Sequence, residues 1–266
     1  MKKPFLILLA LVLVAAGASF LFSRKNIKNQ KSFSVDCQKP RIQAIPRLML
    51  WAWERPEDLR FLDPAQAGVA YLAATLTLSG DGVAVRPRLQ PLKVPAGAYI
   101  MTVVRIEVDS EHAPTRSEAQ RQQTVAEVLK AMKSPNVAAL QIDFDARQSE
   151  RDFYRALLTD LRANLPETMP LVMTALASWC LFDDWIHDLP VDDVVPMVFR
   201  MGKDTENVVK FLASNQSFRS KLCGCSVGVA LDELRPEIPT NRRVYAFNLR
   251  SWTPQQFKFF SEKVRQ

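Results

Sequence analysis

The fold is decided by the stretch Asn136-Val137-Ala138-Ala139-Leu140-Gln141-Ile142-Asp143-Phe144-Asp145-Ala146. Successive side chains of a β-strand point to opposite faces, so Leu140, Ile142 and Phe144 lie on one face. The other face carries polar side chains, those of Gln141, Asp143 and Asp145. A strand this apolar, with helical patterns on both sides, is typical of a parallel sheet covered on both faces. Because two carboxylates are costly in a closed core, the pattern predicts that the inner face opens onto a wet pocket.

A structural role is the alternative interpretation of this pair. Asp145 could cap the helix whose pattern begins near Ser149, or it could pair with an arginine. Asp143 lies deeper in the strand, where capping explains it less well. Residues two apart in a strand have Cα atoms about 6.7 Å apart, so the two carboxylates could flank one bond. Two carboxylates that close raise the pKa of one of them, which would then act as an acid beside a base or nucleophile.

Strand-like apolar runs recur through the body of the chain, and helical patterns separate many of them. There are eight, at 48–53, 69–76, 99–108, 137–145, 171–179, 194–199, 225–231 and 244–249. Alternating strands and helices predict a parallel α/β sheet. Eight strands in about 200 residues predict closure into an irregular (β/α)8 TIM-type barrel, spanning residues 46–266. A doubly wound open sheet is the alternative.

The connections between these strands are of two kinds. Three segments have the pattern of a helix start, in which a Ser or Thr N-cap is followed three residues later by a side chain that can bond back to its backbone N–H. They are Thr115 with Glu118, Ser149 with Asp152 and Thr253 with Gln256. The segments 79–95 and 232–241 are too rich in glycine or proline for a full helix, and the first predicts a hairpin or an ordered loop. Both follow strands, so we expect them on the C-terminal rim.

The N-terminus is apolar and flanked by positive charge. Residues 4–22 form an apolar run close to the roughly 17 residues that can span a bilayer, so 1–23 is expected to be a membrane anchor or a signal peptide. Residues 24–45 are expected to form a polar linker. The chain would then be exported, either periplasmic or anchored in the inner membrane and facing the periplasm.

The net charge of +7 follows from this terminus. Residues 1–31 hold six cations and no acid, so subtracting them leaves +1 for the body. A near-neutral body has no electrostatic footprint for DNA or RNA, which excludes a nucleic-acid partner.

The cysteines leave two interpretations open. Export would permit disulfides that join Cys37 or Cys180 to one member of the Cys223/Cys225 pair. Buried cysteines that act as small apolar residues are the alternative. No histidine or second cysteine pair has zinc-ligand spacing, and neither a metal nor a cofactor is expected.

Acids, arginines and tryptophans gather at the predicted strand ends, a set that suits a carbohydrate. Aromatic rings stack on the apolar faces of sugars, while carboxylates and amides bond the hydroxyls. Asp143, Asp145 and Glu107 are the catalytic candidates. The substrate-binding candidates are Gln141, Trp53, Glu54, Arg105, Trp179, Arg200, Asp232, Asn248 and Trp252. Core packing is the alternative for each tryptophan, and an ordinary ion pair is the alternative for each arginine.

Three stretches resemble an uncharacterised bacterial family of unknown function. They are Gln-Ile-Asp-Phe-Asp-Ala at 141–146, Leu-Ala-Ser-Trp-Cys at 176–180 and Pro-Met-Val-Phe-Arg-Met-Gly at 196–202. The resemblance covers roughly residues 45–255 and implies a barrel, but it names no reaction.

The fourth strand is also remotely similar to that of chitinase-type glycoside hydrolases. Asp143 and Asp145 match the last two aspartates of their motif, whereas its first aspartate falls on Leu140 and its catalytic glutamate on Arg147. Met197-Val198-Phe199-Arg200 aligns with their Met-x-Tyr-Asp and lacks both the hydroxyl and the acid. Trp252 aligns with the tryptophan of their last strand.

These departures define two hypotheses. Arginine cannot donate a proton at neutral pH, so a glycosidase must recruit its acid elsewhere. Glu107 is the first choice, with Glu54 and Asp232 next. The first hypothesis is a hydrolase that acts on an envelope or exported polysaccharide. The second is a non-catalytic glycan-binding or envelope-assembly protein, which Arg147 favours.

Overall fold

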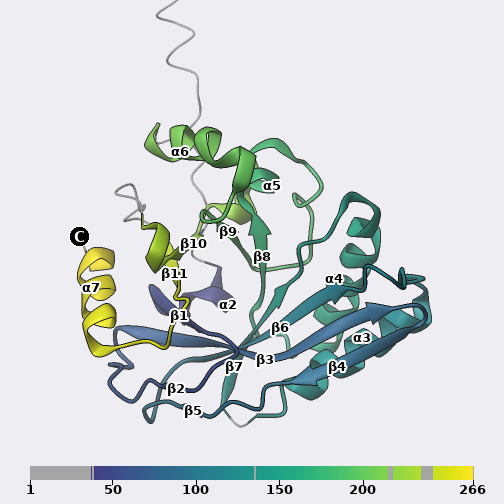
Figure 1. The fold of residues 1–266 in the computed structure, drawn as a ribbon. Coiled ribbons are helices and arrows are strands. Elements are labelled where there is room, and N and C mark those ends of the chain that lie inside the picture. The colour runs from purple at the N-terminus through teal and green to yellow at the C-terminus, as the bar shows by residue number, and fades with distance from the viewer. Residues whose placement is uncertain (1–36, 38, 135, 215–217, 235–241, 266) are drawn as a thin grey trace, which may run out of the picture. The chain divides into compact units, whose positions relative to one another are not determined.

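The computed structural model describes residues 37, 39–134, 136–214, 218–234 and 242–265 (Figure 1). The predicted anchor or signal peptide at 1–23 lies outside the described residues, as does the predicted linker up to residue 36. Within the described ranges, no helix is long and apolar enough to cross a membrane.

Eight parallel strands close into a barrel. In order around it they are β1 (Leu48–Ala52), β3 (Ala67–Ser79), β6 (Ile100–Val108), β7 (Val137–Asp143), β8 (Leu171–Leu176), β9 (Asp193–Met197), β10 (Ser226–Ala230) and β11 (Arg243–Phe247). β1 pairs in parallel with both β3 and β11, which closes the ring. The predicted barrel is therefore confirmed, and the open sheet is excluded.

Helices cover the barrel unevenly. In the described part of the chain, α3 (Glu118–Ala131), α4 (Arg151–Asn164), α5 (Ala177–Phe182), α6 (Thr205–Ala213) and α7 (Pro254–Arg265) follow β6, β7, β8, β9 and β11. After β3 the chain forms the predicted hairpin, with β4 (Gly82–Pro87) antiparallel to β3. β5 (Leu92–Lys93) then pairs with β2 (Glu57–Asp58). After β10 comes a 3-10 turn, Leu231–Glu233, and residues 235–241 lie outside the description.

One of the three predicted helix starts is confirmed. Thr253 Oγ1 accepts a hydrogen bond from Gln256 N (3.3 Å), and Gln256 Oε1 accepts one from Thr253 N (3.0 Å). The prediction for Thr115 is wrong, because Ser117 caps α3 by accepting from Gln120 N. Before α4, a 3-10 turn at Gln148–Glu150 replaces the start expected at Ser149. Short polar residues compete as caps, and the sequence does not choose between neighbours.

Successive side chains of the barrel strands alternate between the outer and the inner face, as the period of two predicts. Both faces are largely apolar. Leu140, Ile142 and Phe144 of the β7 segment pack outward beneath α3 and α4, which lie side by side in Figure 1. The inward-facing core inside the barrel contains Met49, Trp51, Leu72, Met101, Val103, Ala139, Val172, Val195 and Tyr245. Gln141 and Asp143 lie on the inner face of β7, above Ala139, so the predicted division of this strand is confirmed.

The N-terminal end of the barrel is closed by the segment before β1. The short helix α2 (Pro40–Gln43) and the residues after it bury Ile42 and Ile45 in the inner core. Residues 39–45, expected to be linker, are therefore part of the barrel domain.

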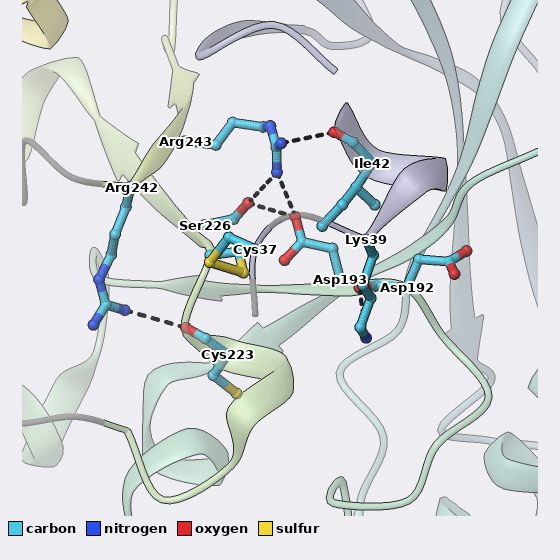
Figure 2. The surroundings of a disulfide bond; sticks show 10 residues. Cys37, Lys39, Ile42, Asp192, Asp193, Cys223, Ser226, Arg242 and Arg243 are labelled. Atoms are coloured by element: carbon cyan, nitrogen blue, oxygen red, sulfur yellow. Dashed lines mark hydrogen bonds and ion pairs between the residues drawn. A yellow bond between two sulfur atoms is a disulfide. The ribbon is translucent and has the colours of Figure 1, made fainter. Parts of the chain in front are cut away.

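The domain contains two disulfides among its described residues, and one of them ties the segment before β1 to the residue that precedes β10. Cys37 is bonded to Cys225 and Cys180 to Cys223, which confirms the disulfide interpretation of the cysteines. Figure 2 shows Arg243 beside the Cys37–Cys225 bond, with its guanidinium directed at Ile42, Ser226 and Asp193. Arg243 Nη2 donates to the Ile42 carbonyl (2.9 Å), and Nη1 lies 2.9 Å from Asp193 Oδ2.

Candidate active site at the barrel rim

A cavity of about 430 Å³ opens among the C-terminal ends of the strands. Its lining combines aromatic, acidic and basic side chains with small residues. They are Trp51, Trp53, Arg105, Asp143, Asp145, Thr174, Leu176, Ala177, Ser178, Met197, Phe199, Arg200, Met201, Gly202, Asp204 and Phe247. This end of a (β/α)8 barrel is where such enzymes carry their active sites. A hollow of about 280 Å³ shares Arg105, Asp143 and Asp145 with the cavity and adds Glu107, Arg147 and Glu150.

Asp143 is held on both oxygens. It is only 5 % exposed, and its Oδ1 accepts a hydrogen bond from Thr174 Oγ1 at 2.6 Å. Its Oδ2 lies 3.4 Å from Arg105 Nη1, and Arg105 Nε donates to Glu107 Oε1 at 2.7 Å. Arg105 is paired with Asp143 in the β6–β7 register, so the sheet itself places the guanidinium between two carboxylates.

Asp145 differs from Asp143 in its contacts. It lies exposed at the cavity mouth, and no described residue makes a hydrogen bond or ion pair with it. Burial raises the pKa of Asp143, although Thr174 and Arg105 favour its ionised form. Desolvation of its inner side by the cavity wall also raises the pKa of Asp145, although its outer side is exposed, and the positive charge of Arg105 acts in the opposite direction. Asp145 is therefore the carboxyl group with free oxygens and a raised pKa.

Four aromatic residues line the cavity, namely Trp51, Trp53, Phe199 and Phe247. Phe199 and Phe247 stack with centroids 5.7 Å apart and planes 5° apart. Trp53 meets Phe247 edge to face at 6.0 Å, and Trp51 meets Phe199 at 6.4 Å. The inward alternation of β1, β9 and β11 brings these four rings together.

The Trp51 ring is locked in place from two sides. Its Nε1 donates to Gln141 Oε1 at 2.7 Å. Across the barrel, a Cβ added to Gly228 would lie only 2.8 Å from Trp51 Cη2. Gln141 is fully buried and does not line the cavity; it orients the ring that does.

Gly228→Ala should displace the Trp51 ring. The added methyl group overpacks the barrel core, which typically costs about 1–3 kcal/mol of stability. We expect the Trp51 indole N–H resonance, assigned by its loss in Trp51→Phe, to shift because its bond to Gln141 is disturbed. Gly68→Ala is the control, since its methyl group would meet Met49 Sδ at 2.7 Å and the Tyr99 carbonyl oxygen at 2.9 Å, away from Trp51. An unshifted Trp51 resonance in Gly228→Ala would contradict this account.

Arg200 anchors the loop that follows β9. Its backbone is left-handed, with φ of 50°, and its N–H donates to Glu233 Oε2 at 2.9 Å. Its Nη2 lies 3.0 Å from Asp232 Oδ2, and its guanidinium lies over the rings of Phe199 and Phe247. These contacts hold the segment after β9, from which Met201, Gly202 and Asp204 also line the cavity.

Six predicted residues line the cavity or its neighbour: Asp143, Asp145, Glu107, Trp53, Arg105 and Arg200. Asp232 supports Arg200 at the rim. Glu54 is exposed and pairs with Arg86. Asn248 is buried, and its Nδ2 donates to Gln256 Oε1 at 3.0 Å, so it supports the start of α7.

Two predicted tryptophans lie in the core instead of the cavity. Trp179 packs against Trp185 in the outer core at 4.9 Å between centroids. Trp252 packs against Phe260, and its Nε1 donates to the Trp51 carbonyl at 2.9 Å. Both are 4 % exposed, which fits the core-packing alternative.

The sequence candidates omit several residues of the cavity. Thr174, Phe199 and Phe247 occupy inward positions at the ends of β8, β9 and β11. The inward direction of these side chains could be predicted from the alternation of each strand. Phe247 is two residues beyond the inward-facing Tyr245, and Phe199 is two residues beyond the inward-facing Met197. Asp204 ends the 3-10 turn Gly202–Asp204 that precedes α6, where no strand periodicity marks it. Among the described residues, no group of three or more His, Cys, Asp or Glu side chains could hold a metal ion.

Comparison with known proteins finds one family. Residues 96–191 match the model of a domain of unknown function, DUF3142. The matched segment runs from before β6 to beyond β8 and includes Arg105, Asp143, Asp145 and Thr174. No curated protein matches the chain, and no solved structure matches it. The resemblance to an uncharacterised family is thus supported over this segment, and the remote similarity to chitinase-type enzymes gains no support.

Proposed function

We propose that the protein binds a glycan in the rim cavity and cleaves it as a glycoside hydrolase. The observation that carries this proposal is that Asp143 and Asp145 line the same cavity as Trp51, Trp53 and Phe247. Apolar rings opposite polar groups match the two faces of a sugar ring. Paired carboxyl groups are the usual machinery of glycoside hydrolysis.

The contacts favour Asp145 as the proton donor. Its oxygens are free to reach a glycosidic oxygen, and its raised pKa keeps more of it protonated than an ordinary aspartate. Glu107 suits this role less well, because Arg105 Nε already donates to its carboxylate.

Asp143 is assigned the complementary role. Thr174 and Arg105 hold its carboxylate in one orientation, which suits a group that stabilises positive charge at the anomeric carbon and accepts a proton from the attacking water. In this scheme Asp145 protonates the leaving oxygen, the bond from that oxygen to the anomeric carbon breaks, and water supplies the new hydroxyl group.

The disulfides support the proposed location. Both cysteine pairs are bonded, and disulfides persist in oxidising compartments rather than in the cytosol. Together with the apolar N-terminus, this supports an exported protein, periplasmic or anchored in the inner membrane and facing the periplasm. An envelope or exported polysaccharide would be the substrate there.

The test is a glycan-array screen of the full chain with release of reducing ends assayed in parallel. Asp145→Asn should lower release on the order of 100-fold, because it removes the proton donor, while glycan affinity changes only a few-fold. Release by the wild type should fall as pH rises through the raised pKa of Asp145, since the protonated form is the active one.

The matched control is Asp152→Asn, the same change on the exposed first turn of α4, outside the cavity. It should release sugar like the wild type. Absence of any glycan binding by the wild type would refute the proposal as a whole. Equal release by Asp145→Asn would refute the assignment of the donor.

A non-catalytic glycan-binding or envelope-assembly protein is the second candidate. The engagement of both Asp143 oxygens favours it, because a carboxylate held by Thr174 and Arg105 can be purely structural. Arg147 is also exposed beside this site, where the resemblance discussed above would place an acid. Binding without release in the same screen would select this candidate.

A further inference from the structure

We propose that the glycan of this cavity carries a free amine, and that Asp204 is the residue that recognises it. The inference rests on the proposed function and adds the substrate class, an amino sugar without its acetyl group. It is drawn from the balance of paired and unpaired charges around the cavity.

The two arginines that line the cavity are already neutralised. Arg105 lies between Asp143 and Glu107, at 3.4 and 2.7 Å. Arg200 lies 3.0 Å from Asp232 and 4.0 Å from Glu233. Each guanidinium thus serves two carboxylates, so neither offers an unmatched positive charge to a ligand. Among the described residues that line the cavity, a uronic acid or a phosphorylated sugar would therefore find no unpaired cation, and Arg147 belongs to the neighbouring hollow instead.

Asp204, in contrast to these arginines, carries a charge that no described residue pairs with. It lines the cavity from the loop after β9, two strands around the barrel from β7. No described residue forms an ion pair or a side-chain hydrogen bond with its carboxylate, and it does not cap α6, although it occupies the N-cap position. A helix N-terminus favours negative charge at this point. Asp204 is thus a carboxylate that no described side chain pairs with, at a helix N-terminus that favours its negative charge, and it has no role in the proposed bond cleavage.

The aromatic lining suits the same ligand. An ammonium group gains energy over the face of an aromatic ring, most strongly over tryptophan, and Trp51 and Trp53 line this cavity with Asp204. Trp51 is only 2 % exposed, so the half-buried Trp53 is the indole that a ligand can reach. A carboxylate and an accessible indole together suit a cation carried on a ring with an apolar face. A protonated amino sugar has this combination, because its ring stacks while its amine pairs.

The experiment compares two oligosaccharides of equal length, one of glucosamine and one of N-acetylglucosamine. Titration calorimetry on the full chain should give affinity about tenfold higher for the glucosamine oligomer. Asp204→Asn should remove this preference by weakening the glucosamine oligomer alone. Glu206→Gln is the control, because it removes one charge two residues away on the exposed face of α6, and the preference should survive it.

The outcomes separate the two proposals. If neither oligomer nor any glycan on the array binds, the proposed function fails and this inference fails with it. If the acetylated oligomer binds as well as or better than the glucosamine oligomer, a glycan site stands but the amine is not recognised. If Asp204→Asn weakens both oligomers equally, Asp204 contacts a hydroxyl group and the inference is overturned.

Discussion

Replacing Cys37 and Cys225 with serine should lower the melting temperature of the full chain by about 10–20 °C. The bond closes a loop with a sequence separation of 188 residues. In the chain-entropy model such a loop is worth about 5 kcal/mol. For a domain of this size each kcal/mol shifts the melting temperature by about 2–4 °C. The loss should also free α2 from the N-terminal end of the barrel, which differential scanning calorimetry with amide exchange at Ile42 would detect.

The second disulfide provides the comparison. Cys180 and Cys223 are separated by 43 residues, for which the same model gives about 4 kcal/mol. Serine at these two positions should also lower the melting temperature, but exchange at Ile42 should remain slow. A Cys37/Cys225 variant that melts like the wild type would show that Arg243 and the apolar contacts of Ile42 and Ile45 hold the segment without the bond.

The strand interiors were predictable from the sequence because side-chain direction is strictly periodic there. The alternation at 136–146 placed Asp143 and Asp145 on the inner face and Phe144 outside, and the structure has this arrangement. Gln141 shows the limit of that rule. It faces inward, as expected, but one layer below the cavity, where it accepts the Trp51 N–H. Periodicity gives the face of a residue and does not give its depth.

Beyond the strand ends the rule no longer applies. Trp179 was placed at the rim by extending β8, yet the strand ends at Leu176 and α5 begins at Ala177. The helix turns Trp179 into the outer core. Trp252 follows β11 after a four-residue gap and folds back onto Trp51. A change from the two-residue period to a helical or irregular path rotates each later side chain, and nothing local in the sequence marks where it occurs.

The closure of the N-terminal end depends on contacts between residues far apart in sequence. The stretch before β1 reads as polar linker because its only apolar residues are scattered. Ile42 and Ile45 are nevertheless core residues, and Arg243, about 200 positions later, binds the carbonyls of both. The sequence predicts that Cys37 or Cys180 could pair with one member of Cys223/Cys225. It does not predict that Cys37 pairs with Cys225, because that choice depends on this packing.

The Arg243–Asp193 pair lies at the centre of that closure, and Arg243→Met should lower stability by about 3–5 kcal/mol at neutral pH. Asp193 is buried, its Oδ2 lies 2.9 Å from Arg243 Nη1, and it also accepts from Ser226 Oγ at 2.5 Å. Removing the guanidinium leaves a buried carboxylate uncompensated and two backbone carbonyls without their donor. The melting temperature should fall by roughly 10 °C.

The pH dependence identifies the cause. Burial raises the pKa of Asp193 to about 6, although Arg243 favours the ionised form. A carboxyl group with a raised pKa binds its proton more tightly in the folded state, so its contribution to stability is full below its unfolded pKa near 4 and is lost as pH rises through about 6. Without Arg243 the folded pKa of Asp193 rises further, so the deficit of Arg243→Met should be larger at pH 8 than at pH 5, where only the loss of the two carbonyl bonds and of packing remains.

The neighbouring arginine is the control for this prediction. Arg242 is half-buried against Phe218, with its guanidinium 4.5 Å from the ring centroid. Its Nη1 donates to the Cys223 carbonyl (Figure 2). It forms no ion pair with any described residue. Arg242→Met should therefore cost packing and one hydrogen bond, a loss that stays constant between pH 5 and pH 8. Denaturant unfolding of both variants at the two pH values makes the comparison. An equal deficit for Arg243→Met at pH 5 and pH 8 would mean that its carbonyl bonds, and not Asp193, account for its effect on stability.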